Sequence, residues 1–153
     1  MPSNFLCVRF EKDSDGSGKL MARAEAGGFA GEGGAYFSIS QIEEFAAAIG
    51  AFPLTTAERP SISGGFWKRA APSELEQEHL GIEVYPIDAR GHVGILVRLM
   101  QELWPGTRPE SQNGVRLEIV TSYQPLAEFS RKLAALIHGN ISEAVLCGDD
   151  LPP

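Results

Sequence analysis

The first part of the chain alternates between apolar and polar residues, a period of two that is typical of β-strands with one buried face. Residues 5–12 (FLCVRFEK) place leucine, valine and phenylalanine on one side and charged residues on the other. Residues 13–18 (DSDGSG) predict a turn, because Asp and Gly tolerate left-handed backbone. The alternation resumes over 19–26, so we predict a β-hairpin.

The same period returns in several later segments. Predicted strands cover 35–39, 63–69, 81–87, 92–103 and 115–122, with a short one at 144–147. Between them, 88–92 (DARGH) predicts a tight turn. Residues 104–114 (WPGTRPESQNG) predict a loop, because proline and glycine interrupt regular structure.

A period near 3.6 predicts a first helix that begins at Ser40. Ser40 and Glu43 have the spacing of a capping box, in which two side chains satisfy free backbone N–H groups. Gly50 is a suitable C-terminal cap, and Pro53 forbids simple continuation. The predicted buried stripe consists of Ile42, Phe45, Ala46 and Ile49.

A second helix is predicted over 125–138. Pro125 is well tolerated in a first helical turn, Gly139 ends the helix, and His138 in the last turn complements the helix dipole. The predicted buried stripe consists of Leu126, Phe129, Leu133, Leu136 and Ile137.

The order of strands, helix, strands and helix does not favour a doubly wound parallel sheet. We predict one α+β domain over 1–153, mainly an antiparallel meandering β-sheet with two α-helices packed on one face. Its core covers about 5–147, and a frayed C-terminal tail follows. Charged residues on the strands indicate that the other sheet face is solvated. These are Arg23, Glu25, Glu83, Arg98, Arg116 and Glu118.

The formal net charge of −7, from 13 basic and 20 acidic residues, bears on which classes of partner are expected. Nucleic acids and anionic membranes need clustered Lys and Arg, so neither is an expected partner, whereas a basic protein is compatible. No stretch resembles a transmembrane helix, and the start of the chain lacks the features of a signal peptide. We therefore expect a cytoplasmic protein.

Five glycines lie within residues 27–34, which raises the question of a phosphate-binding loop. The dinucleotide fingerprint fails because its third glycine position falls on Tyr36. A P-loop needs a lysine, and none lies between Lys19 and Lys68. An extended run follows the glycines instead of a helix N-terminus. The pattern favours a bulged or tightly turned strand connection, where glycine relieves steric conflict.

Residues 11–22 resemble a calcium loop, but the twelfth position is Ala22 where a bidentate Glu is required. The histidines, His79, His92 and His138, show no metal-binding spacing. Residues 76–81 (EQEHLG) bring carboxylates close to His79, and two explanations stay open: an adventitious metal, or a polar loop that approaches a strand.

Cys7 and Cys147 lie near opposite ends of the chain and do not have the spacing of a metal site, so two reduced, partly buried thiols are expected. No serine has a nucleophile-elbow context. Trp67 is expected in the core, and for Trp104 the core and an interface are equally open. The sequence therefore predicts no catalytic residue, cofactor or metal.

The ordered segments AEAGGFAGEGGAYFSISQIEEFAAAIGAF, GIEVYPIDARGHVGILVRLM and VRLEIVTSYQPLAEFSRKLAALI resemble the WapI-type bacterial immunity protein family and its uncharacterised relatives. The shared features include the turn at 28–31 and the strand opening at 91–93, within a match over about 20–138. The resemblance implies a small cytosolic α+β protein without catalytic residues that binds the toxin domain of a contact-delivered weapon. Residues 66–80 and 104–114 depart from the family pattern, and specificity is expected to vary there because loops carry recognition.

Three functions follow as expectations. The first is a non-enzymatic binding protein, of the immunity type, that neutralises a cognate toxin domain by direct contact. The alternative is a small-molecule-binding or enzymatic domain with a pocket between helices and sheet. The third is a structural subunit that pairs through sheet edges. The oligomeric state stays open.

Overall fold

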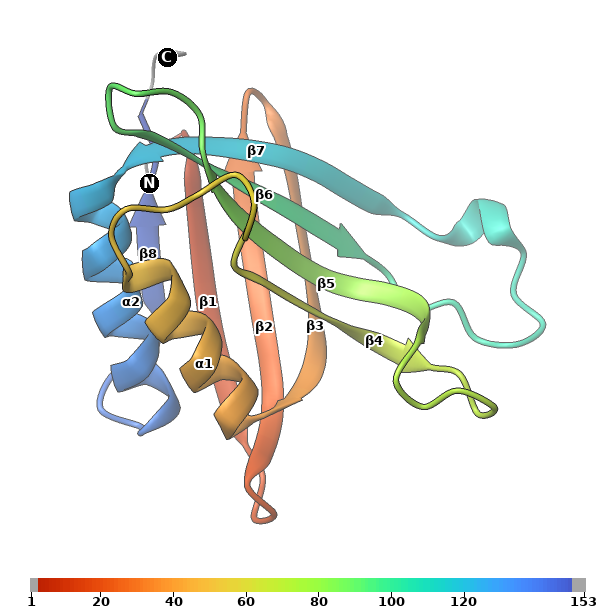
Figure 1. Ribbon diagram of the computed structural model, residues 1–153. Coiled ribbons are helices and arrows are strands. Elements are labelled where there is room, and N and C mark those ends of the chain that lie inside the picture. The colour runs from red at the N-terminus through yellow and green to blue at the C-terminus, as the bar shows by residue number, and fades with distance from the viewer. Residues whose placement is uncertain (1–2, 150–153) are drawn as a thin grey trace.

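The computed structural model describes residues 3–149, and residues 150–153 of the predicted C-terminal tail lie outside them. Eight strands form two four-stranded antiparallel sheets (Figure 1). The first sheet has the order β3-β2-β1-β8, and the second has the order β4-β5-β6-β7. The strands are β1 (Phe5–Lys12), β2 (Ser17–Ala26), β3 (Phe29–Ser38), β4 (Ser61–Trp67), β5 (Leu75–Pro86), β6 (His92–Met100), β7 (Gly114–Ser122) and β8 (Ala144–Cys147).

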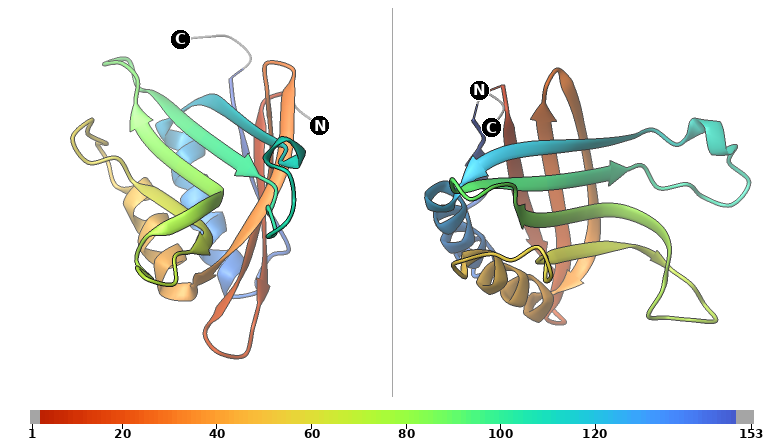
Figure 2. Two further views of the ribbon diagram at one scale, coloured as in Figure 1. Left: turned by 90° about the vertical axis from the view of Figure 1, so that its right-hand side faces the viewer. Right: turned by 45° about the horizontal axis from the view of Figure 1, so that its top comes forward.

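Two α-helices, α1 (Ile39–Gly50) and α2 (Tyr123–Ile137), pack side by side, and a short 3-10 helix η1 covers Pro109–Ser111. Helix α2 contacts β1, β7 and β8, and α1 contacts β3 and β4. The α+β class with antiparallel strands is therefore confirmed. The division of the strands into two sheets is a further feature, and Figure 2 shows that the strands of the second sheet cross those of the first.

The buried residues of both helices are those of the two predicted stripes. The predicted helix start at Ser40 is wrong, because β3 continues to Ser38 and the helix begins directly after it. Ser38 and Gln41 form the capping box in place of Ser40 and Glu43. The Gln41 backbone N–H donates to Ser38 Oγ at 3.2 Å, and the Ser38 N–H donates to Gln41 Oε1 at 2.9 Å.

The glycine-rich segment has a geometric role, as expected. Gly27 and Gly28 have positive φ angles of 60° and 84° and form the two-residue turn between β2 and β3, where such angles are required. Strand β3 then runs through the remaining glycines, so the predicted start at residue 35 is six residues late.

Gly31 and Gly33 lie where β3 crosses the second sheet. A Cβ added to Gly31 would be 2.5 Å from Val115 Cγ1, and one added to Gly33 would be 2.9 Å from the backbone oxygen of His79. Both distances are shorter than a van der Waals contact. The two sheets therefore approach each other so closely at β3 that side chains are excluded.

We expect Gly33→Ala to lower the free energy of unfolding by about 1–3 kcal/mol, because the new methyl group meets backbone that cannot rotate away. Urea denaturation measures this change as a lower midpoint. Ala30→Val is a matched control, because this residue of the same strand is exposed. An unchanged midpoint for Gly33→Ala would contradict the close approach of the sheets.

Thr121 on β7 is completely buried, and its hydroxyl has no hydrogen-bond partner among the described residues. Burial of an unpaired hydroxyl costs free energy. Thr121→Val keeps the shape and removes the hydroxyl, so we expect the free energy of unfolding to stay constant or to rise by about 1 kcal/mol. Thermal and urea unfolding test this, and a clear loss of stability would show that the hydroxyl is paired.

Candidate functional site

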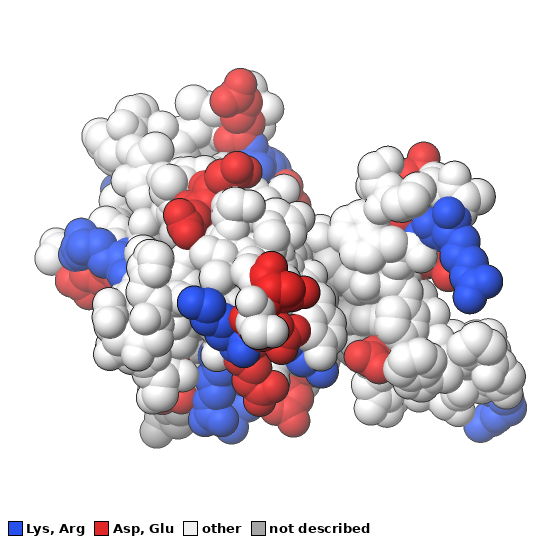
Figure 3. Space-filling model, turned by 90° about the horizontal axis from the view of Figure 1, so that it is seen from below, with Lys and Arg blue, Asp and Glu red and all other residues white. Residues whose placement is uncertain are grey.

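The strands of the second sheet extend beyond the first sheet on the side away from the helices (Figures 1 and 2). This extension carries the β4–β5 loop and the β6–β7 loop, and we call residues 65–79 and 99–114 the projecting lobe. In Figure 3 the lobe ends in two arms separated by a gap, and basic side chains lie on both arms. The lobe contains much of the two segments, 66–80 and 104–114, that depart from the family pattern.

A cluster of three aromatic rings in edge-to-face and tilted contacts forms the base of the lobe. Phe66 lies between His79, at a ring-centroid distance of 4.5 Å, and Trp104, at 4.9 Å. His79 is buried with 2% of its surface exposed, whereas Trp104 is 59% exposed. Trp67, the next residue on β4, is 41% exposed, so its predicted place in the core is wrong.

Gln77 holds the β6–β7 loop against β5. Its side-chain Nε2 donates to the backbone oxygen of Leu103 at 2.8 Å, and the Leu103 N–H donates to Gln77 Oε1 at 3.1 Å. This pair of bonds fixes the orientation of the amide, so His79 Nε2 is the donor in its 2.9 Å bond to Gln77 Oε1. Because Trp104 directly follows Leu103, the same bonds hold the backbone beside this residue, and its exposed indole packs on Phe66.

A hollow of about 980 Å³ lies between the two arms of the lobe. Trp67 and Trp104 line it together with Lys68, Arg69 and Glu76. Trp67 comes from the β4 side and Trp104 from the β6–β7 loop. The fold therefore brings the chain's two tryptophans, which are 37 positions apart in the sequence, to one hollow.

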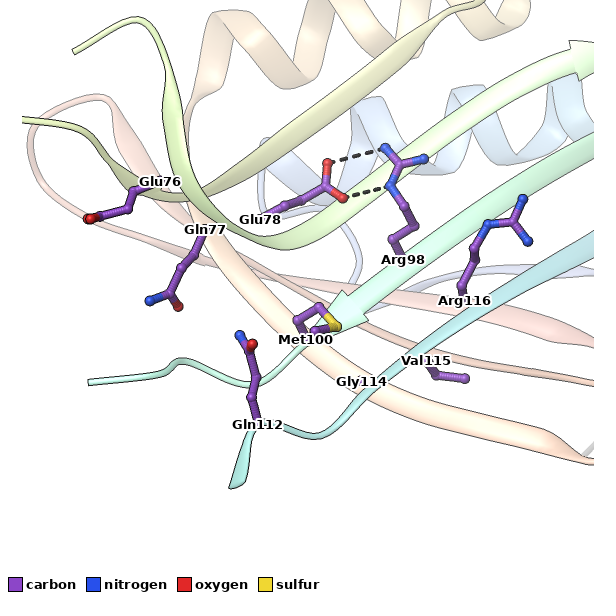
Figure 4. A pocket seen from close by; sticks show the side chains of 9 residues that line it. All are labelled: Glu76, Gln77, Glu78, Arg98, Met100, Gln112, Gly114, Val115 and Arg116. Carbon is purple, nitrogen blue, oxygen red and sulfur yellow. Dashed lines mark hydrogen bonds and ion pairs between the residues drawn. The ribbon is translucent and has the colours of Figure 1, made fainter. Parts of the chain in front are cut away.

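A second hollow, of about 530 Å³, lies on the β5, β6 and β7 strands (Figure 4). Arg98 donates to Glu78 through Nε at 2.6 Å and through Nη2 at 3.2 Å. Ser63 Oγ also donates to Glu78. Burial opposes ionisation of Glu78, but the hydrogen bonds from Arg98 and Ser63 outweigh it and hold the pKa of this carboxyl below its usual value. Arg116 is opposite Arg98 on β7 and has no carboxylate partner among the described residues.

A third hollow, of about 690 Å³, lies against the first sheet and is lined by residues that include Cys7 and Glu143. Burial raises the pKa of the Cys7 thiol, and Glu143 adds to this effect by accepting its hydrogen bond at 3.4 Å. Cys147 is exposed and lies on β8, where it is opposite Phe5, two pairs along the ladder from the Cys7–Val145 pair. Both thiols are free, and the buried one is held in its protonated form.

The histidines and their acidic neighbours lie in different places. His79 faces Phe66, Glu78 binds Arg98, and Glu76 is exposed, so residues 76–81 do not converge on one point. His92 Nδ1 is 2.6 Å from Asp88 in the β5–β6 turn. Among residues 3–149, no group of three or more His, Cys, Asp or Glu side chains has a geometry that could hold a metal ion.

The space between the helices and the sheets is filled by apolar side chains. Ile42, Phe45, Phe129 and Leu133 are each at most 4% exposed and belong to one continuous core with the strands. The three hollows described above lie elsewhere. Within the described part of the chain, no helix combines the length and the apolar character needed to cross a membrane.

Comparison of this chain with protein-family models, with curated proteins and with solved structures finds no match. The resemblance to the WapI-type immunity family therefore stays a prediction. The geometry of the projecting lobe, with two exposed indoles on a fixed base, carries the functional argument.

Burial lowers the pKa of His79, so its imidazole is neutral in the folded protein at pH 7. Glu102 opposes this shift and Lys19 adds to it. The unfolded state, with a pKa of about 6.5, binds a proton before the folded state does. Stability from this group is therefore present above about pH 6.5 and is lost as the pH falls toward the lower folded pKa.

We expect His79→Gln to flatten the loss of unfolding free energy between about pH 7 and pH 5, because the proton uptake in this range is removed. Urea unfolding at a series of pH values measures the slope. His138→Gln is the control, because this histidine is exposed at the end of α2. Equal slopes for the wild type and His79→Gln would show that His79 is not buried as a neutral group.

Proposed function

We propose that this chain is a non-enzymatic binding protein that acts by direct contact with a protein partner through the projecting lobe. One observation carries the proposal: Trp67 and Trp104 are both exposed and both line one hollow, beside contacts made by Phe66, Gln77 and Leu103. Tryptophan is enriched among the residues that dominate binding energy. A prearranged surface also loses less conformational entropy when it binds.

The family resemblance suggests the partner. A toxin domain encoded beside this chain fits an immunity role, and the net charge of −7 favours a basic domain by complementarity. The two segments without a family counterpart meet in the lobe, which fits a surface whose specificity differs among relatives.

We expect Trp104→Ala to weaken binding to the purified toxin domain of the neighbouring reading frame by about 2 kcal/mol, or about thirtyfold. Truncation removes an indole that lines the hollow and is 59% exposed, so the core loses little. Isothermal titration calorimetry measures the affinity, and a toxicity assay measures neutralisation. Phe29→Ala is the matched control, because Phe29 is 68% exposed beside the β2–β3 turn, outside the lobe.

Two results would contradict different parts of this proposal. If the purified toxin domain is neither bound nor inhibited by the wild-type protein, the immunity role fails. If it is bound but Phe29→Ala weakens binding while Trp104→Ala does not, the lobe is the wrong surface.

A further inference from the structure

We infer that the hollow between the two arms of the lobe binds an extended, proline-containing peptide segment that carries a carboxylate. This inference rests on the proposed function, since it names the part of the protein partner that enters the lobe. Three properties of the hollow support it. Aromatic side chains line it, the Gln77 amide in its lining is already hydrogen-bonded within the protein, and cations outnumber carboxylates among the charged residues that line it.

The aromatic walls suit a polyproline II segment. Phe66, Trp67 and Trp104 all line the hollow, and the ring centroids of Phe66 and Trp104 are 4.9 Å apart. Neither indole N–H donates a hydrogen bond to any described residue, so both are free to bond a ligand carbonyl. A polyproline II chain has no internal hydrogen bonds, so its carbonyls need such donors, and its rings pack on aromatic grooves.

The hydrogen bonds that the Gln77 amide already makes within the protein disfavour a ligand that is rich in hydroxyl groups. Both ends of the Gln77 amide are engaged by Leu103, and Oε1 also accepts from His79. These groups stabilise the lobe itself and leave little capacity for a sugar, which needs many convergent hydrogen-bond partners. A ligand with apolar rings and a few carbonyl groups matches what the hollow offers.

The charged residues that line the hollow predict the sign of the ligand's charge. Lys68 and Arg69 line the hollow with one carboxylate, Glu76, although the whole chain has a charge of −7. Lys68 is 3.2 Å from Glu74, whereas Arg69 has no ion pair among the described residues. An added carboxylate beside Arg69 would form a charge-assisted, bidentate hydrogen bond. We therefore expect an acidic segment to bind better than a basic one.

The chain offers a direct readout, because its two tryptophans both line this hollow. Intrinsic tryptophan fluorescence thus reports occupancy without a label. The probes are three synthetic peptides of equal length: polyproline with two glutamates, a glycine-serine peptide with two glutamates, and polyproline with two lysines. Trp67→Phe and Trp104→Phe each leave one reporter and show whether both walls contact the peptide.

We expect the acidic proline peptide to shift and change the emission of both single-tryptophan variants. Its affinity should exceed that of each other peptide by about tenfold, because each of them lacks one complementary property. Arg69→Gln should reduce the preference for glutamate over lysine, whereas Arg131→Gln on α2 should not. Equal binding of the proline and glycine-serine peptides, equal binding of the acidic and basic peptides, or no binding of any probe would overturn the inference.

These outcomes are distinct from failure of the proposed function. If no peptide binds but Trp104→Ala still weakens binding to the toxin domain, the lobe contacts its partner through a folded surface and only the peptide inference fails. If the acidic proline peptide binds and the toxin domain does not, the hollow is correctly assigned and the immunity role fails.

Discussion

The close approach of β3 to the second sheet is the constraint on which the rest of the structure depends. It requires glycine at 31 and 33, because a Cβ at either position would collide with Val115 or with the backbone of His79. Gly64 on β4 serves the same contact from the other side, where a Cβ would be 2.7 Å from the Phe37 ring. Away from this contact, α1 and α2 fill the space beside the sheets with large apolar side chains. The two sheets are therefore in direct contact at β3, and the helices fill the wider space away from this contact.

This arrangement of the two sheets explains why the lobe exists and how it is stabilised. The second sheet passes over β3 at His79, Leu99 and Val115, and the strand ends beyond that crossing have no first sheet against them. His79 lies at the boundary: its backbone oxygen faces Gly33, and its ring packs on Phe66. The lobe thus has its own small set of contacts, which continues through Gln77 to the loop of Trp104. A surface held in this way is arranged before any partner binds.

The sequence predicts the elements of this fold that have an unbroken period. Both helical stripes and the alternation of β2 and β7 correspond to the observed burial. The alternation predicted for β1 is only partly correct, because Phe5–Val8 are buried on both faces of the strand. The start of β5 at Leu75 was not predictable, because register shifts at Gly64–Gly65 and Phe66–Trp67 of its partner β4 interrupt the period. The exposure of Trp67 follows from the same irregularity. The lobe itself depends on contacts between residues distant in sequence, such as Gln77 with Leu103, which no local pattern encodes.

The net charge of the whole chain and the charged residues that line the hollow act on a partner at different distances. They therefore favour different features of that partner. The net charge of −7 sets the field that an approaching protein meets, but screening limits this field to about 8 Å at physiological salt. The residues that line the hollow include two tryptophans, two cations and one carboxylate. Under the proposed function, the net negative charge of this protein would attract a basic domain. The hollow would then bind a short acidic, proline-containing segment of that domain. Rim charges mainly set association rates, whereas buried aromatic contacts set dissociation rates, so the acidic body and the aromatic lobe would control different steps of one binding event.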